Sequence, residues 1–103
     1  MKLSDYIADF LSSQQIKHVF VVSGGAALSL IESISRATNI DFVCTQHEQS
    51  GAMAADAYSR VSHNIGAAVA TSGPGVTNML TGIACSYYDS IPCIFIAGQV
   101  ATF

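Results

Sequence analysis

Hydrophobic and polar positions alternate between two patterns along the chain, one typical of buried strands and one of amphipathic helices. Short runs rich in β-branched and aromatic residues predict strands at residues 18–22, 40–44, 65–70 and 93–97. Between them, apolar positions recur at helical spacing, which predicts helices over residues 4–15, 26–37, 47–60 and 76–88. Strands and helices therefore follow one another in turn.

This order predicts the fold class. Strands that alternate with helices in units of this length indicate β-α-β crossovers and a mostly parallel sheet. Because the strands are apolar almost throughout, we expect helices to cover both faces. The predicted fold is α/β, a doubly wound, three-layer sheet. We expect one domain over residues 1–103, incomplete at its carboxyl end because residues 98–103 directly follow a strand with no further helix.

Three polar turns follow three of the strands, at residues 23–25, 45–48 and 71–75. The carboxyl ends of parallel strands lie at one edge of a sheet, where α/β folds bind their ligands. We therefore expect these turns to form one rim. The second turn carries Glu48, the first candidate for proton chemistry. The alternative is a solvated glutamate that stabilises the N-terminus of a helix.

Taken singly, the motifs of these turns are weak. The run from Gly73 to Asn78 resembles a dinucleotide fingerprint, but Asn78 stands where the third glycine belongs. The pair His47-Glu48 lacks the second histidine of a zinc-protease motif. A glycine pair such as Gly24-Gly25 is typical of any tight turn. Only the combination of the turns is informative.

Composition adds limits on the partners. Charged residues make up 11% of the 103 residues, against roughly 25% in ordinary globular chains, which predicts an interface on the surface. The helix over residues 47–60, with small residues on one side, is the expected place for a subunit contact. The net charge of −3 and the four scattered cations argue against nucleic acid as a partner.

No apolar run approaches the roughly 20 residues that span a bilayer, and the start of the chain lacks a signal-peptide pattern, so we expect no membrane association. The three cysteines have no metal-binding spacing and lie in apolar surroundings. We expect them to be reduced core thiols in a cytoplasmic protein.

Residues 47 to 100 contain five motifs in a fixed order: His-Glu-Gln, Ala-Met-Ala-Ala-Asp-Ala-Tyr-Ser-Arg, Thr-Ser-Gly-Pro-Gly-Val-Thr-Asn, Asp-Ser-Ile-Pro and Ile-Ala-Gly-Gln-Val. In this combination the chain closely resembles the N-terminal, pyrimidine-binding domain of thiamine-diphosphate-dependent enzymes. The nearest branch is that of acetohydroxyacid (acetolactate) synthases. Ser23 replaces the proline that this branch has before its Gly-Gly-Ala turn.

The resemblance implies a role for each turn. Glu48 would hydrogen-bond the aminopyrimidine of the cofactor and favour the imino tautomer that deprotonates the thiazolium carbon, which then attacks pyruvate or another 2-oxo acid. The residues implied to bind the cofactor with Glu48 are Thr71, Gly73, Pro74, Gly75 and Asn78. Those implied on the substrate side are Gly24, Gly25 and Gln49.

The resemblance also implies what lies outside these residues. In the family, Mg²⁺ and the diphosphate are held by a separate domain with a Gly-Asp-Gly motif, which this sequence does not contain, so we expect no metal ligand here. Active sites form between subunits, which implies a homodimer or homotetramer, and some branches bind FAD. We expect the chain alone to be inactive. A 2-oxo acid decarboxylase and a non-catalytic α/β fragment that keeps only the fold and the interface stay open as alternatives.

Overall fold

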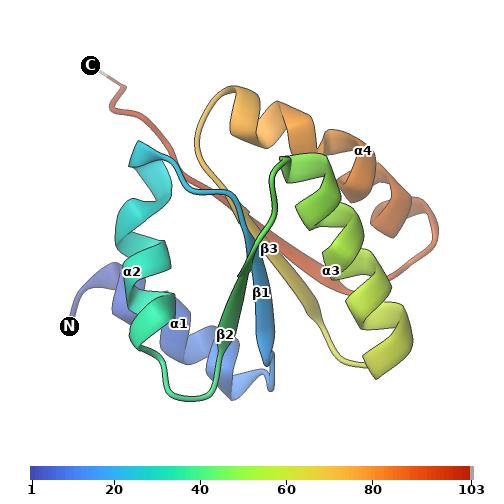
Figure 1. Ribbon diagram of the computed structural model, residues 1–103, viewed down its shortest axis with the longest axis horizontal. Helices are drawn as coiled ribbons and strands as arrows, with labels where there is room; N and C mark the ends of the chain where they lie inside the picture. The colour runs from blue at the N-terminus through green and yellow to red at the C-terminus, as the bar shows by residue number, and fades with distance from the viewer. Residues whose placement is uncertain (103) are drawn as a thin grey trace.

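Four parallel strands form one sheet in the computed structural model, which describes residues 1–102. The strands lie in the order β2-β1-β3-β4 (Figure 1). Their bounds are His18–Val21 for β1, Asp41–Cys44 for β2, Gly66–Ala70 for β3 and Cys93–Ala97 for β4. The sheet therefore has β1 and β3 at its centre and an edge strand on each side.

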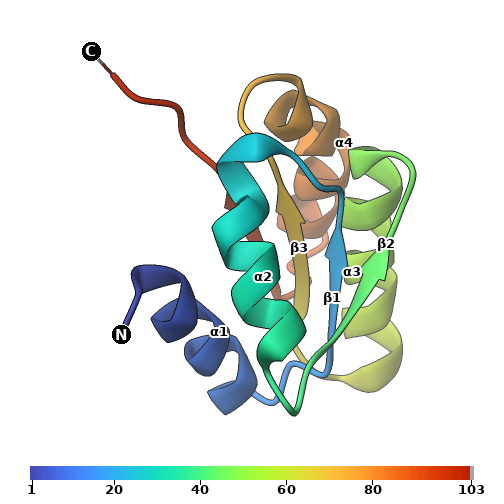
Figure 2. The same cartoon turned by 60° about the vertical axis from the view of Figure 1, so that its left-hand side comes forward.

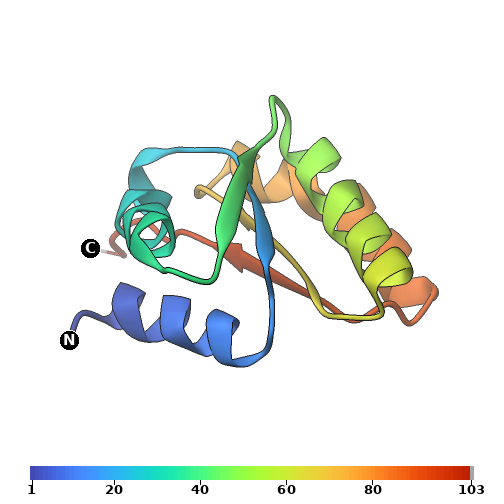
Figure 3. The ribbon, with the colours of Figure 1, turned by 60° about the horizontal axis from the view of Figure 1, so that its bottom comes forward.

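Two pairs of helices cover the sheet, one pair on each face (Figures 1 and 3). On one face lie α1 (Leu3–Ser13) and α2 (Leu28–Arg36). The 3₁₀ turn η1 (Gly25–Ala27) comes directly before α2. On the other lie α3 (Glu48–Ser62) and α4 (Pro74–Tyr88). The prediction of an α/β sheet with helices on both faces is confirmed. None of the helices within residues 1–102 is long and apolar enough to cross a membrane.

The central strand β3 belongs to two cores at once. Ala67 and Val69 pack with the residues of α1 and α2, whereas Ala68 and Ala70 pack with Ala52, Ala55 and Met79 of α3 and α4. All five residues of β3 are buried, and none is larger than valine. Small side chains on both faces let helices come close to the sheet from either side.

Several element boundaries differ from the pattern by one or two residues, and the starts of three helices show why. Helix α1 begins at Leu3 rather than after a Ser4 cap, and the Ser4 hydroxyl lies instead 2.9 Å from the Ser33 hydroxyl, to which it is able to donate a hydrogen bond. Helix α4 begins at Pro74, two residues early, because a proline with its fixed φ fits the first helical position. The expected start of a helix at Ala26 is a 3₁₀ turn.

Two expectations about burial are wrong. All residues of β2 are exposed, since the apolar pattern of a strand does not reveal that it lies at an edge. Cys44 and Cys85 are exposed as well, and only Cys93 is half-buried, where burial raises the pKa of its thiol. The small side of α3 also packs within this chain, because Ala52 and Ala55 face β3 and α4.

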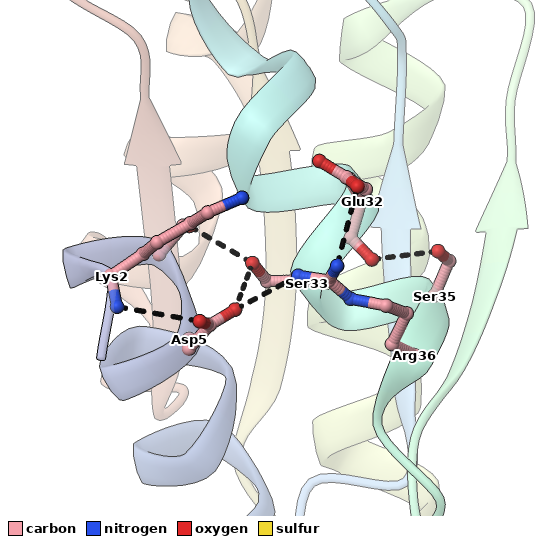
Figure 4. Close-up of polar contacts among 7 residues, drawn as sticks. Lys2, Asp5, Glu32, Ser33, Ser35 and Arg36 are labelled. Atoms are coloured by element: carbon pink, nitrogen blue, oxygen red, sulfur yellow. Dashed lines mark hydrogen bonds and ion pairs between the residues drawn. The ribbon is translucent and has the colours of Figure 1, made fainter.

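A polar cluster fastens α1 to α2 (Figure 4). Asp5 of α1 accepts a hydrogen bond from the Ser33 hydroxyl at 2.7 Å and pairs with Arg36 at 3.1 Å. Arg36 also pairs with Glu32, one turn earlier in α2, at 3.3 Å. The hydrogen bond from Ser33 is the main reason why the pKa of Asp5 lies below its usual value.

A second cluster fastens α3 to α4 on the opposite face. Arg60 pairs with Asp56, as the spacing on the helix predicts, and also with Asp89 after α4. The buried hydroxyl of Ser86 donates to the other oxygen of Asp56 at 2.7 Å. The hydrogen bond from Arg60, aided by that from Ser86, lowers the pKa of Asp56. The ionised carboxylate therefore ties both helices together.

We predict that Asp56→Asn lowers the free energy of unfolding by about 1–3 kcal/mol at neutral pH, because it removes a charge from a buried hydrogen-bonded cluster. The unfolded chain has an aspartate pKa near ~3.9, and the folded value lies below it. The contribution of Asp56 is thus fully present above about pH 4 and is lost as the pH falls through the folded value.

Urea unfolding of both proteins between pH 7 and pH 3 tests this prediction. The difference between wild type and variant should shrink toward acid. Asp9→Asn removes an exposed carboxylate of α1 and serves as the control. A difference that stays the same across the whole range would contradict the role given to the ionised form of Asp56.

Candidate functional site

The turns after β1, β2 and β3 meet at the carboxyl edge of the sheet, as expected (Figures 1 and 2). Gly24 of the first turn lies against Thr71 of the third, since a Cβ added to Gly24 would stand 2.7 Å from the Thr71 Oγ1. Glu48 of the second turn lies beside Gly75 of the third, since a Cβ added to Gly75 would stand 3.7 Å from the Glu48 Oε2. The three turns form one continuous rim.

Glu48 is the first residue of α3 and is half-buried. The polar residues before it explain why the helix begins there. The Thr45 hydroxyl donates to the carbonyl of His47 at 3.1 Å, and the His47 Nδ1 accepts the backbone N–H of Gln49 at 3.1 Å. His47 is thus the N-cap of α3, a function that the sequence did not indicate because histidine is not a common capping residue.

The Glu48 carboxylate has one fixed partner. Its Oε1 accepts a hydrogen bond from the side-chain amide of Asn78 in α4 at 3.1 Å. Its Oε2 lies beside Gly75, 3.7 Å from the position of an added Cβ. One oxygen is therefore held by a neutral donor, and no hydrogen bond to the other oxygen is found within residues 1–102.

Glycine keeps the rest of the rim narrow. A Cβ on Gly75 would stand 3.0 Å from the Thr71 methyl group, so the start of α4 lies directly over Thr71. Gly73 has φ +67°, a value that L side chains rarely adopt, and turns the chain into α4. The backbone of this turn is thereby presented to solvent without a covering side chain.

The structure brings together Gly24, Glu48, Thr71, Gly75 and Asn78 from the predicted site. Gly25 and Gly73 face open space, where an added Cβ would meet nothing within 4 Å. Pro74 is exposed at the start of α4. Gln49, the residue after Glu48, is half-buried, and its backbone N–H donates to the His47 side chain. Chemically, a carboxylate held by an amide beside an open, glycine-lined rim is able to share a proton with a flat, polar ring.

Comparison with known proteins identifies the family of the chain. Residues 1–102 match the family described as thiamine pyrophosphate enzyme, N-terminal TPP binding domain. The chain belongs to this family. Thiamine pyrophosphate is another name for thiamine diphosphate.

Relatives with assigned functions point to one branch of thiamine pyrophosphate enzymes. The chain is 40% identical over 99 residues to acetolactate synthase isozyme 3 large subunit of Escherichia coli, covering 96% of this chain and 17% of the relative. It is 42% identical over 92 residues to an acetolactate synthase large subunit of Buchnera aphidicola, covering 89% and 16%. The chloroplastic acetolactate synthase of Arabidopsis thaliana is 39% identical over 99 residues, with 96% and 15% covered. The chain thus spans less than a fifth of the length of these relatives.

The two adjacent glycines of the first turn provide a matched test of the rim. We predict that Gly24→Ala lowers the free energy of unfolding by about 1–3 kcal/mol, because its methyl group would overlap with Thr71 and force the first and third turns apart. Gly25→Ala places the same methyl group in open space and should leave stability unchanged. Denaturant unfolding measures both variants, and equal stability of the two would contradict the contact between the turns.

Proposed function

We propose that this chain binds the aminopyrimidine ring of thiamine diphosphate and that Glu48 exchanges a proton with that ring. In this proposal the chain is the N-terminal part of an acetolactate synthase, which joins two 2-oxo acids, pyruvate being the first candidate. The hydrogen bond between Glu48 and Asn78 at the rim carries the proposal, because it presents a carboxylate with one oxygen held and one free.

The residues of the rim fit the proposed ring. Gly73 is exposed and would carry its Cβ into open space, so a flat ring is able to approach the backbone closely there, while Gly75 lets the start of α4 pack against Thr71. The amide of Asn78 and the hydroxyl of Thr71 add polar groups at the same edge. Gly24, Gly25 and Gln49 are proposed to face the substrate.

Each residue then has a definite task. Glu48 holds or accepts the proton at Oε2 while Asn78 keeps the carboxylate in place through Oε1. Thr71, Gly73, Pro74 and Gly75 orient the ring and exclude water from one of its faces. When bound, thiamine diphosphate supplies the carbon that adds to the 2-oxo acid and takes up the electrons released when carbon dioxide leaves.

The remaining components belong to the proposal as well. We propose that Mg²⁺ and the diphosphate are held outside these residues, that FAD is an optional cofactor of the whole protein, and that residues 1–103 alone do not turn over substrate. A cytoplasmic location stays a prediction, because the relatives include a chloroplastic and a mitochondrial acetolactate synthase.

A homodimer or homotetramer is the proposed assembly. Its support is an apolar groove of about 460 Å³ between α3 and Phe20 of β1, where Val61 is 83% exposed. The groove is lined by Phe20, Ala54, Ala57, Tyr58, Val61 and Ser62. An apolar surface of this kind favours burial against a second copy.

Two alternatives differ in their products. A 2-oxo acid decarboxylase would use the same rim and release an aldehyde, whereas a synthase joins the product to a second 2-oxo acid. The names of the relatives favour the synthase. A non-catalytic protein would keep the fold but would have no need of a free carboxylate oxygen at the rim.

The variant Glu48→Gln in the full-length protein tests the proposal. It keeps the shape of the side chain but removes the proton-sharing carboxylate, so exchange of the C2 proton of the cofactor and consumption of pyruvate should fall by roughly 10²–10⁴-fold. Both rates are measured at saturating cofactor, together with thermal stability. Loss of a solvated glutamate at a helix N-terminus would instead cost about 0.3–1 kcal/mol of stability and no chemistry.

Glu32→Gln is the matched control, because Glu32 is an exposed glutamate of α2 that pairs with Arg36 and belongs to none of the three rim turns. It should exchange and turn over like wild type. If Glu48→Gln does so too, Glu48 is a structural residue and the proposed function is wrong.

A further inference from the structure

Helices α3 and α4 meet in three contacts that repeat every four residues on both helices. Glu48 bonds to Asn78, Ala52 lies against Gly82, and Asp56 bonds to Ser86. The two residues of each pair are thirty positions apart in the sequence. Residues four apart share one side of a helix, so the three pairs form a single seam.

The seam begins at the candidate site and ends at the ion-pair cluster. Its first pair lies at the rim, and its last pair, Asp56 and Ser86, is held by Arg60. The two end pairs are polar and need their partners at hydrogen-bond distance. The middle pair contains no polar side chain and decides how closely the helices approach.

Gly82 permits an unusually close approach at this middle pair. A Cβ added to it would overlap with the Cβ of Ala52 and would stand 3.1 Å from the Ala52 carbonyl carbon and 3.2 Å from the Met53 nitrogen. The overlap with the Ala52 Cβ is the most severe of the three contacts, and a Cβ cannot turn aside as the end of a flexible side chain does. A side chain at position 82 therefore requires the helices to move apart.

The Glu48–Asn78 bond has little room for such a movement. It lies one helical turn, about 5.4 Å, from the middle pair. Its length is 3.1 Å, and a bond between nitrogen and oxygen weakens beyond about 3.2 Å. A shift of α4 away from α3 by a fraction of an ångström lengthens this bond past its useful range.

We propose that Gly82 is a positioning residue for the candidate site, because it sets the spacing of α3 and α4 at which Asn78 holds the Glu48 carboxylate. This inference rests on the proposed function for its catalytic consequence. The structural part, that the spacing at Gly82 controls the Glu48–Asn78 bond, stands on the geometry of the seam.

The test is Gly82→Ala in the full-length protein. A crystal structure of the variant should show the Asn78 amide beyond 3.5 Å from the Glu48 carboxylate. The affinity for thiamine diphosphate, measured by titration calorimetry with Mg²⁺, and C2-proton exchange should each fall by about 10–100-fold, the effect of a misplaced catalytic group. Helix propensity alone predicts that Gly82→Ala stabilises α4 and costs no affinity, since alanine favours a helix over glycine.

Two further variants complete the design. Thr81→Ala, at the neighbouring exposed position of α4, should bind the cofactor like wild type. The exchange variant Ala52→Gly/Gly82→Ala removes the opposing methyl group and should regain a large part of the lost affinity. If Gly82→Ala does not fold, recovery of folding and cofactor binding by this double variant supports the proposal.

Other outcomes would overturn it. The first is a folded Gly82→Ala variant in which the Glu48–Asn78 bond is unchanged. The second is a Gly82→Ala variant that loses thermal stability but keeps its affinity for thiamine diphosphate and its rate of C2-proton exchange. The third is a double variant that regains neither folding nor binding. If wild type itself binds no thiamine diphosphate, the proposed function fails, while the distance between Glu48 and Asn78 in the variant still decides the structural part.

Discussion

The structure depends on the close approach of α3 to the central strand β3. A Cβ on Gly66 would overlap with the carbonyl group of Ala55, so the backbone of the helix lies directly on the start of the strand. Protein interiors are densely packed, and a helix held this closely has little freedom to slide or tilt. Because α3 begins at the rim, the position of Glu48 is fixed by packing in the middle of the helix, two turns further along.

This packing links the fold to the chemistry proposed for it. Small residues of β3, α3 and α4 bring two helices side by side over one face of the sheet. A larger residue at any of these places would separate groups that now bond to one another across the helices. The small residues, which have no reactive groups, thus determine where the reactive groups stand.

The sequence was sufficient for the fold and for the place of the site. Hydrophobic periodicity located the strands and helices, and the rule for parallel sheets brought the turns at Gly24, Glu48 and Thr71 to one edge. The sequence did not show the His47 cap, because histidine is not a common capping residue. It also did not show the exposure of β2 or the bond from Ser86 to Asp56, since both depend on neighbours distant in the chain. The roles of individual rim residues stay predictions.

The pairing of β1 with β3 has a consequence for how the protein folds. Strand β2 and helix α3 come between these two strands in the sequence, yet β3 inserts beside β1 and not beside β2. Gly24 and Thr71 therefore meet only after a long loop has closed, and loop closure of this kind is slow compared with the formation of helices. The candidate site therefore has no local precursor in the chain, because it exists only where distant segments of the sequence have been brought together.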